Sequence, residues 1–212
     1  MITVIIPTLW QCDRLVTTLQ ELSECPEVGE VLLFDNTANK KRISLPKLQH
    51  ILEGRNTYVG APWNKGAAMA KYDHLLVLND DTWMDWSYLA QISQQITDSR
   101  GMLGIAQKNY QLKEAAQLQF LPVTNRPNAF ACLFFIHKSS WIPIPDEIKI
   151  WATDCWLFTK NQQAGRSNYY IQGLPVIGYV SKTVGHLKQH DSDEFNRIIK
   201  QDLTMKAKYN LI

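Results

Sequence analysis

The chain has 212 residues, of which 45% are hydrophobic and 20% are charged, and its formal net charge is +2. This length suits one compact domain, and the hydrophobic content excludes disorder as the dominant state. The small net charge falls well short of that of a dedicated nucleic-acid binder. Residues 130–136 form the longest uncharged apolar run, which is far too short to span a bilayer, and the first residues lack a secretory signal. We therefore expect a soluble, cytoplasmic protein.

The predicted elements alternate along the first half of the chain. Residues 2–6 are a continuous β-branched run ended by Pro7, which is typical of a strand buried on both faces. Apolar residues at helical spacing follow, and the alternation then repeats. The expected strands are residues 2–6, 31–34, 75–78 and 102–106, and the expected helices lie around residues 15–22, 64–71 and 86–96. This order predicts an α/β domain with a mostly parallel central sheet.

The second half of the chain has a looser pattern. Residues 112–121 favour a helix and residues 130–136 a buried strand, whereas residues 151–160 and 193–208 favour helices. No repeat, low-complexity tract or linker interrupts the chain, so we expect one domain over residues 1–212.

The four cysteines, Cys12, Cys25, Cys132 and Cys155, are scattered. They form no CxxC pair and have no histidine at the spacing of a zinc site. The pattern predicts free, inert thiols rather than a disulfide framework or a zinc module.

Polar residues follow three of the predicted strands, at Pro7–Thr8, Asp35–Asn36 and Asn79–Asp81. The carboxyl ends of parallel strands meet at one edge of the sheet, and ligands bind outside that edge. We therefore expect these three groups to surround a ligand.

The strongest single feature is the run of residues 75–82, Leu-Leu-Val-Leu-Asn-Asp-Asp-Thr, in which an apolar strand leads into two adjacent carboxylates. Asp80 and Asp81 repel each other unless a cation or hydrogen-bond donors neutralise them. Hard oxygen ligands suit Mg²⁺ or Mn²⁺. Alternatively, one of these aspartates only caps the helix expected near Trp86.

Residues 60–70, Gly-Ala-Pro-Trp-Asn-Lys-Gly-Ala-Ala-Met-Ala, form a Gly- and Pro-containing turn that leads into a helix. A helix N-terminus near Asn64 and Lys65 could receive phosphate or hydroxyl groups. The simpler interpretation is a loop followed by a packed, alanine-rich helix.

Four short motifs together resemble the family 2-like glycosyltransferases of the GT-A fold. They are Ile-Thr-Val-Ile-Ile-Pro-Thr at residues 2–8, Leu-Phe-Asp-Asn-Thr at 33–37, Asn-Lys-Gly at 64–66 and Leu-Asn-Asp-Asp-Thr at 78–82. The resemblance is close over the first half of the chain and loose over the second. It implies a Rossmann-like three-layer domain whose nucleotide-sugar-binding half is about residues 1–106 and whose acceptor-binding half is about residues 107–212.

The resemblance also implies roles for residues of the first half. Pro7, Thr8 and Asp35 would bind the base and ribose of a nucleotide-diphosphate sugar, and Asn64 and Lys65 would contribute to the same site. Residues 79–81 resemble the DXD element of the family, with asparagine at its first position. Asp81 would then ligate Mn²⁺ or Mg²⁺, and Asp80 would lie near the ribose or the sugar.

In the second half, residues 151–157 resemble the acidic motif at the start of a helix in these enzymes, with Thr153 in place of the usual acid. Asp154 would be the catalytic base. Its place between Trp151 and Trp156 suggests apolar surroundings that raise its pKa, which suits removal of a hydroxyl proton. An N-capping role is the alternative. The two tryptophans would bind the acceptor.

Residues 185–190, Gly-His-Leu-Lys-Gln-His, offer the last candidates. In the family a late histidine completes the metal shell and a nearby basic residue contacts the diphosphate. The resemblance assigns these roles to His186 and Lys188, with His190 as the competing metal ligand. Solvated histidines in a polar loop are the alternative.

The leading interpretation is a metal-dependent, inverting glycosyltransferase with a UDP-sugar as the expected donor. A hydroxymethylated base in DNA is one hypothesis for the acceptor, as in phage-type DNA-modifying members acting in the host cytoplasm, because Lys40, Lys41 and Arg42 form a basic loop and the chain has seven tryptophans. A saccharide or lipid-linked acceptor is the alternative. A non-catalytic binding module on the same scaffold is the non-enzymatic alternative. Sugar nucleotidyl transfer is disfavoured because residues 7–11 do not resemble its phosphate loop.

Overall fold

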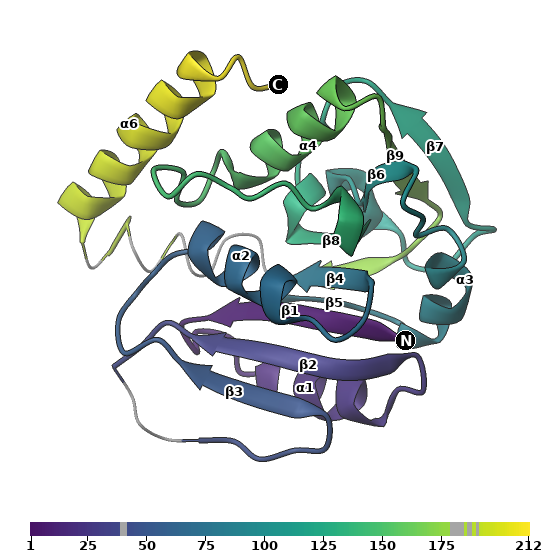
Figure 1. Ribbon diagram of the computed structural model, residues 1–212. Coiled ribbons are helices and arrows are strands. Elements are labelled where there is room, and N and C mark those ends of the chain that lie inside the picture. The colour runs from purple at the N-terminus through teal and green to yellow at the C-terminus, as the bar shows by residue number, and fades with distance from the viewer. Residues whose placement is uncertain (39–41, 179–184, 186–187, 190) are drawn as a thin grey trace.

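The computed structural model describes residues 1–38, 42–178, 185, 188–189 and 191–212, and its centre is an eight-stranded sheet (Figure 1). A separate two-stranded ribbon lies beside it. The strands of the large sheet are β1 (Ile2–Thr8), β2 (Val28–Asp35), β3 (Leu48–Leu52), β4 (His74–Leu78), β6 (Arg100–Gly104), β7 (Gln119–Val123), β8 (Leu133–His137) and β9 (Ser167–Gln172), and those of the ribbon are β5 (Thr82–Met84) and β10 (Val176–Gly178).

Helices connect the strands and pack on the sheet. The α-helices are α1 (Leu15–Glu24), α2 (Gly60–Met69), α3 (Leu89–Ser93), α4 (Thr153–Gln163) and α6 (Ser192–Lys208), and the 3₁₀-helices are η1 (Trp86–Tyr88), η2 (Gln107–Gln111), η3 (Phe130–Cys132) and η4 (Lys138–Ser140). None of the helices in the described part of the chain is both long enough and apolar enough to cross a membrane.

The strand order of the large sheet is β3-β2-β1-β4-β8-β6-β9-β7. The first four strands are mutually parallel, β8 runs antiparallel to β4 and β6, and β9 is again parallel to β6. The prediction of a mostly parallel α/β sheet is therefore confirmed.

The strand ends predicted to surround a ligand lie at one edge. In Figure 1 the arrows of β1, β2, β3 and β4 all point to the same side of the molecule. Thr8, the last residue of β1, is in register with Asp35, the last residue of β2. The backbone N–H of Asn36 donates to the carbonyl of Thr8 at 2.9 Å. Because β4 is the other neighbour of β1, Asn79 follows at the same edge.

The core has two layers because the alternate residues of each buried strand face opposite sides of the sheet. Val4 and Ile6 of β1 belong to a buried cluster that includes Leu15 and Leu19 of α1. Ile5 belongs to a second cluster, on the face covered by α2 and α4. Every residue of β1 is buried, which explains why its sequence is a nearly continuous β-branched run instead of an alternation of apolar and polar residues.

Gly66 allows α2 to lie very close to β1. A Cβ atom at this position would be 2.6 Å from a methyl group of Ile5, so a larger residue would push the helix away from the sheet. Gly66 thereby permits the short distance between α2 and β1.

Two details of the second half differ from the sequence prediction. Residues 112–118 form no regular element, and residues 119–123 form the edge strand β7, so the helix predicted over 112–121 is wrong. Pairing of β7 with β9 outweighs the helical leucine spacing, and Pro122 is compatible with an edge strand. The strand predicted over 130–136 begins instead with η3 and becomes β8 at Leu133.

The C-terminal helix α6 is attached to the loop that precedes α4. The carboxylate of Asp202, buried in α6, accepts the backbone N–H groups of Lys149, Ile150 and Trp151 at 2.9, 2.8 and 2.7 Å. Phe195 also packs edge-to-face on Trp151, with ring centroids 5.5 Å apart. Helix α6 therefore fixes the loop at residues 149–151, two of which, Ile150 and Trp151, line the cavity described below.

All four cysteines lie in the described part of the chain and are free, and Cys12, Cys25 and Cys155 are buried. The prediction of unpaired thiols is confirmed.

Candidate active site

A cavity of about 510 Å³ lies at the carboxyl edge of the sheet. This volume is within the range of small-molecule sites. Residues that follow β1, β2 and β4 line one side, and residues of α2, η3 and α4 line the other. Of the residues that the sequence predicted for the site, six line the cavity: Pro7, Thr8, Asp80, Asp81, Trp151 and Asp154.

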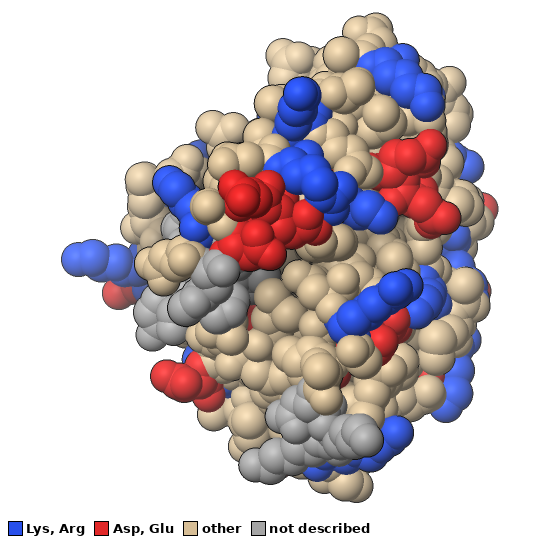
Figure 2. Space-filling view, turned by 90° about the vertical axis from the view of Figure 1, so that its left-hand side faces the viewer, with Lys and Arg blue, Asp and Glu red and all other residues tan. Residues whose placement is uncertain are grey.

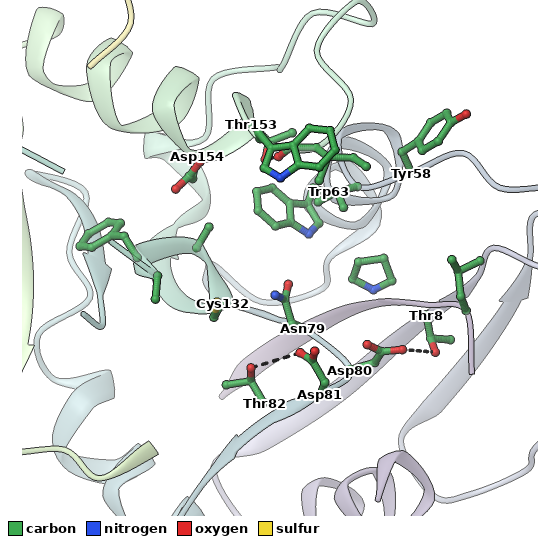
Figure 3. Close-up of a pocket in the computed structure, with 18 of the residues that line it drawn as sticks. Thr8, Tyr58, Trp63, Asn79, Asp80, Asp81, Thr82, Cys132, Thr153 and Asp154 are labelled. Atoms are coloured by element: carbon green, nitrogen blue, oxygen red, sulfur yellow. Dashed lines mark hydrogen bonds between the residues drawn. The ribbon is translucent and has the colours of Figure 1, made fainter. Parts of the chain in front are cut away.

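Asp80 is held by the end of the neighbouring strand. The hydroxyl of Thr8 donates to its Oδ2 atom at 2.6 Å, as the dashed line in Figure 3 shows. Burial and, to a smaller extent, the charge of Asp81 raise the pKa of Asp80 to about 6, although the hydrogen bond from Thr8 opposes the increase. The ionised form of Asp80 is thus costly in the absence of a cation.

Asp81 is buried beside it, and the following ribbon fixes its backbone. The hydroxyl of Thr82 lies 3.4 Å from its Oδ1 atom. Thr82 begins β5, which pairs with Gly178 of β10. A Cβ atom at Gly178 would lie 2.8 Å from the carbonyl oxygen of Asp81, so the glycine permits this close approach.

The donor atoms at this strand end fit a divalent metal ion. Two adjacent, buried carboxylates are hard oxygen ligands of the type that Mg²⁺ and Mn²⁺ prefer. The described residues contain no group of three or more His, Cys, Asp or Glu side chains that could hold a metal ion. A metal at Asp81 would therefore complete its coordination with ligands from outside this set, such as phosphate oxygens and water.

The other predicted metal ligand, His186, and its competitor His190 lie outside the described residues, as do Lys40 and Lys41. Lys188 is described and exposed, and it does not line the cavity. The structure therefore leaves the roles assigned to this segment as predictions.

Asp35 lies behind the cavity wall rather than on it. It is fully buried, and hydrogen bonds occupy both of its oxygens: Oδ1 accepts the backbone and hydroxyl groups of Thr37, and Oδ2 accepts the indole N–H of Trp10 at 2.8 Å. The Nε2 atom of His50 lies 3.3 Å from the same Oδ2. Although burial raises the pKa of Asp35, the bonds from Thr37 and Trp10 outweigh it and lower the pKa. A ligand would reach this carboxylate only after Trp10 moved.

Asp154 lies in the first turn of α4, at the far end of the cavity from Asp80 and Asp81 (Figure 3). Its Oδ1 accepts the backbone N–H of Cys155 at 2.9 Å, and its Oδ2 accepts Nη1 of Arg126 at 2.8 Å. Burial raises the pKa of Asp154, whereas the charge of Arg126 and, more weakly, that of Lys206 lower it. A buried carboxylate that lines a cavity and has a raised pKa has the properties of a general base.

The sequence did not indicate Arg126. It lies in the loop between β7 and η3, lines the cavity and is mostly buried, with 20% of its side chain exposed. Its ion pair with Asp154 joins residues 28 positions apart, so no local pattern could show it. In this loop Ala129 has φ of 64°, a left-handed conformation that is strained for a residue with a side chain.

Cys132 lies on the wall between the two acidic ends. Burial raises the pKa of its thiol to about 11, and the charges of Asp81 and Asp154 both contribute. Cys132 is thus a neutral thiol and a wall residue rather than a nucleophile.

The apolar walls of the cavity are mainly aromatic. They include Tyr58, Trp63, Tyr110, Phe130 and Trp151. Trp156 does not line the cavity: it packs edge-to-face on Tyr209 and donates its indole N–H to the carbonyl of Ile142. The structure thus brings Trp151, but not Trp156, to the candidate site.

Asn64 and Lys65 also point elsewhere. The Nδ2 atom of Asn64 donates to the carbonyl of Ile144, and its Oδ1 accepts the backbone N–H of Ile144 and the indole of Trp141. Lys65 makes an exposed ion pair with Glu53 at 2.6 Å. Neither residue lines the cavity. Their contacts fit the simpler interpretation of this segment, a packed helix, and their predicted ligand roles are untested.

Charges of both signs surround the site. The face toward which the strands β1 to β4 point shows basic and acidic groups next to one another around a largely uncharged centre (Figure 2). In the described residues, Arg197 pairs with Glu194 at 2.5 Å, and the first turn of α6 adds Asp193. The visible part of this face is therefore mixed in charge, not basic.

Neither protein-family models nor curated proteins give a match to this chain. Solved structures do match in fold. The crystal structure of S. aureus TarS 1-349 is 14% identical in sequence to this chain. The match covers 98% of this chain and 72% of TarS 1-349, with a TM-score of 0.59. The complex of TarS 1-349 with UDP is 15% identical in sequence, and the match covers 97% of this chain and 71% of that chain with a TM-score of 0.59. The complex of TarS 1-349 with UDP-GlcNAc is 16% identical in sequence, and the match covers 80% of this chain and 57% of that chain with a TM-score of 0.58.

These similarities show a GT-A-like, Rossmann-type α/β fold, which is the fold class that the sequence predicted. At these identities the likeness concerns the fold.

Proposed function

We propose that this chain transfers a sugar from a nucleotide-diphosphate sugar to an acceptor hydroxyl, with a metal ion and with inversion at the anomeric carbon. The observation that carries the proposal is that two separate acidic centres, Asp80–Asp81 and Asp154, line one cavity of about 510 Å³ on this fold. One centre suits a metal-bound diphosphate, and the other suits an acceptor hydroxyl.

UDP is the nucleotide we propose for the donor. TarS structures that are similar in fold to this chain hold UDP and UDP-GlcNAc. Here Pro7 and Thr8, the last residues of β1, and Asn36, which follows β2, form the end of the cavity where the nucleotide would bind. Binding outside the carboxyl ends of parallel strands is the general behaviour of such sheets.

In this proposal Asp81 holds the metal ion, with Asp80 beside it. When bound, Mn²⁺ or Mg²⁺ would neutralise the charge that develops on the leaving diphosphate. The hydrogen bond from Thr8 orients Asp80. The repulsion between two buried carboxylates favours the binding of a cation.

Asp154 would accept the proton of the acceptor hydroxyl. The new bond forms between the acceptor oxygen and the anomeric carbon as the bond from that carbon to the diphosphate oxygen breaks. A single displacement of this kind inverts the anomeric configuration. It needs one carboxylate at the acceptor end, and Asp154 is the only carboxylate there among the described residues that line the cavity.

A saccharide is the acceptor we favour over a base in DNA. The aromatic side chains of the cavity offer flat apolar faces to sugar rings. A DNA acceptor would call for a positive surface beside the site, whereas the described residues visible on the face in Figure 2 are mixed in charge.

A thermal-shift experiment with UDP and UDP-GlcNAc, with and without MnCl₂, tests the proposal. A ligand at one hundred times its Kd stabilises a protein by about 2.7 kcal/mol, which for this size raises Tm by about 5–10 °C. We expect such a rise only when nucleotide and Mn²⁺ are both present. It should disappear in Asp81→Asn and persist in Asp98→Asn, whose exposed side chain does not line the cavity.

A flat response to every nucleotide, with and without the metal, would contradict the proposal. Binding of UDP-GlcNAc without release of UDP in the presence of any of a panel of oligosaccharides would support the non-catalytic alternative.

A further inference from the structure

Trp63 carries a polar atom that has no hydrogen-bond partner among the described residues. Its side chain is 1% exposed and lines the cavity, and its Nε1 atom is buried without an acceptor. A buried N–H group without a partner costs about 1–3 kcal/mol. Such groups are rare in folded proteins and call for an explanation.

Of the six other tryptophans of this chain, four donate the indole N–H group to a defined acceptor: Trp10 to Asp35, Trp86 to Glu21, Trp141 to Asn64 and Trp156 to Ile142. Trp63 lies deeper than any of them, since it is among the largest fully buried side chains. Its unpaired nitrogen is therefore not a general feature of how this fold packs tryptophan.

The surroundings of Trp63 hold its ring in place. Its ring packs edge-to-face on Phe134, with centroids 5.3 Å apart, and its helix is pressed on β1 at Gly66. Turning the indole to find an acceptor elsewhere would break this packing. The N–H group is thus fixed in a position where the protein supplies no acceptor.

The position lies between the two acidic centres. In Figure 3, Trp63 is across the cavity from Asn79, Asp80 and Asp81, and Asp154 lies further along the same side as Trp63. If the diphosphate binds at Asp81 and the acceptor at Asp154, the transferred sugar occupies the space between them. Hydroxyl, carbonyl and ring oxygens of a sugar are hydrogen-bond acceptors that could satisfy the indole.

We propose that Trp63 donates its indole N–H to an oxygen of the transferred sugar and thereby contributes to recognition of the sugar rather than of the nucleotide. This inference rests on the proposed function, because it places the sugar between Asp81 and Asp154. It assigns a donor-sugar contact to α2, where the sequence had suggested Asn64 and Lys65 as the ligand-binding residues.

The first test follows the indole resonances of ¹⁵N-tryptophan-labelled protein, with Mg²⁺ as the metal because it is diamagnetic. Trp63→Phe identifies the Trp63 resonance by its absence. Saturation with UDP, and then with UDP-GlcNAc, UDP-glucose, UDP-galactose or UDP-GalNAc, separates the effects of nucleotide and sugar. We expect the Trp63 resonance to move with at least one UDP-sugar and to move much less with UDP.

The second test compares affinities by calorimetry. Loss of one neutral hydrogen bond corresponds to about a three- to tenfold loss of affinity. Trp63→Phe should weaken the best-binding UDP-sugar by this factor and change the affinity for UDP by less than twofold. Trp86→Phe is the matched control, since its indole donates to Glu21 outside the cavity, and it should change neither affinity.

The two proposals fail in different ways. If UDP does not bind to the wild-type protein, the proposed function is wrong. If UDP and a UDP-sugar bind but the Trp63 resonance responds equally to both, or to neither, the role of Trp63 is wrong. The resonance test measures the wild-type protein and needs Trp63→Phe only to assign the Trp63 resonance. If that variant does not fold, Trp→Phe variants of the other six tryptophans, made one at a time, assign the Trp63 resonance by elimination.

Discussion

Removal of the charge of Asp80 should stabilise the protein at neutral pH. Asp80 is 7% exposed, accepts a hydrogen bond from Thr8 and lies next to Asp81. Asp80→Asn keeps the shape of the side chain and an oxygen that can accept the Thr8 hydroxyl. The substitution therefore tests the cost of the buried charge and leaves the packing nearly unchanged.

The magnitude follows from the pKa of Asp80, which burial raises from 3.8 to about 6. The folded state holds this proton more tightly than the unfolded state, so the stability linked to protonation is present below pH 3.8 and is lost as the pH rises to about 6. Each pH unit between the two values is worth 1.36 kcal/mol. At pH 7.5 the ionised carboxylate therefore costs about 3 kcal/mol, most of which Asp80→Asn should recover.

The assay is urea unfolding of both proteins between pH 4 and pH 7.5 in the presence of a chelator. The variant should be more stable by about 2–3 kcal/mol at pH 7.5, and the difference should shrink toward zero near pH 4. The exposed Asp98→Asn serves as the control and should show no such trend. Equal stability of variant and wild type at every pH, or a less stable variant at pH 7.5, would refute the account of Asp80.

Three further predictions concern the acceptor end of the cavity. Asp154→Asn should reduce sugar transfer by at least about a hundredfold and leave the Kd of UDP-GlcNAc unchanged, because loss of a general base affects the chemical step. Arg126→Gln removes the cation that pairs with Asp154, so the pKa of Asp154 should rise and the acidic limb of the kcat/KM profile should move to higher pH. Lys206, Cys132 and Cys155 also face Asp154. Asp202→Ala leaves three partly buried N–H groups without their acceptor and should lower the free energy of unfolding by about 3 kcal/mol, measured by urea unfolding.

Specific results would contradict these predictions. Turnover of Asp154→Asn close to that of the wild type would contradict the proposal that Asp154 is the catalytic base. A uniform loss of rate in Arg126→Gln, with the pH profile unmoved, would leave Arg126 with a structural role only. Unfolding of Asp202→Ala within 0.5 kcal/mol of the wild type, a scale typical of surface substitutions, would mean that α6 does not fix the loop before α4.

The first half of the fold could be predicted because its signals are local. Residues 2–6 are a continuous β-branched run that ends at Pro7, and residues 75–78 are an apolar run that ends at Asn79; such runs are typical of strands buried on both faces. Their parallel pairing then brings Thr8 to Asp80. In contrast, the leucine spacing of residues 112–121 predicted a helix that does not form, because residues 119–123 pair with β9 as strand β7.

Parts of the candidate site could not be predicted because they depend on distant contacts. The pairing of Arg126 with Asp154 joins the loop after β7 to the first turn of α4, which lie far apart in the sequence. The enclosure of Asp35 by Trp10 and His50 depends on three different segments. The unpaired nitrogen of Trp63 becomes visible only when every neighbour of the ring is known. Sequence motifs thus indicated the cavity residues at the ends of β1 and β4 better than the contacts around Asp154.

A crystal structure of the protein with UDP-GlcNAc and Mn²⁺, with anomalous data to locate the metal, tests the central claim most directly. The account predicts an anomalous peak at Asp81, the diphosphate bound to that ion and the sugar between Asp81 and Asp154, within reach of the Trp63 indole. A nucleotide bound outside this cavity, or a sugar directed away from Asp154, would contradict the account.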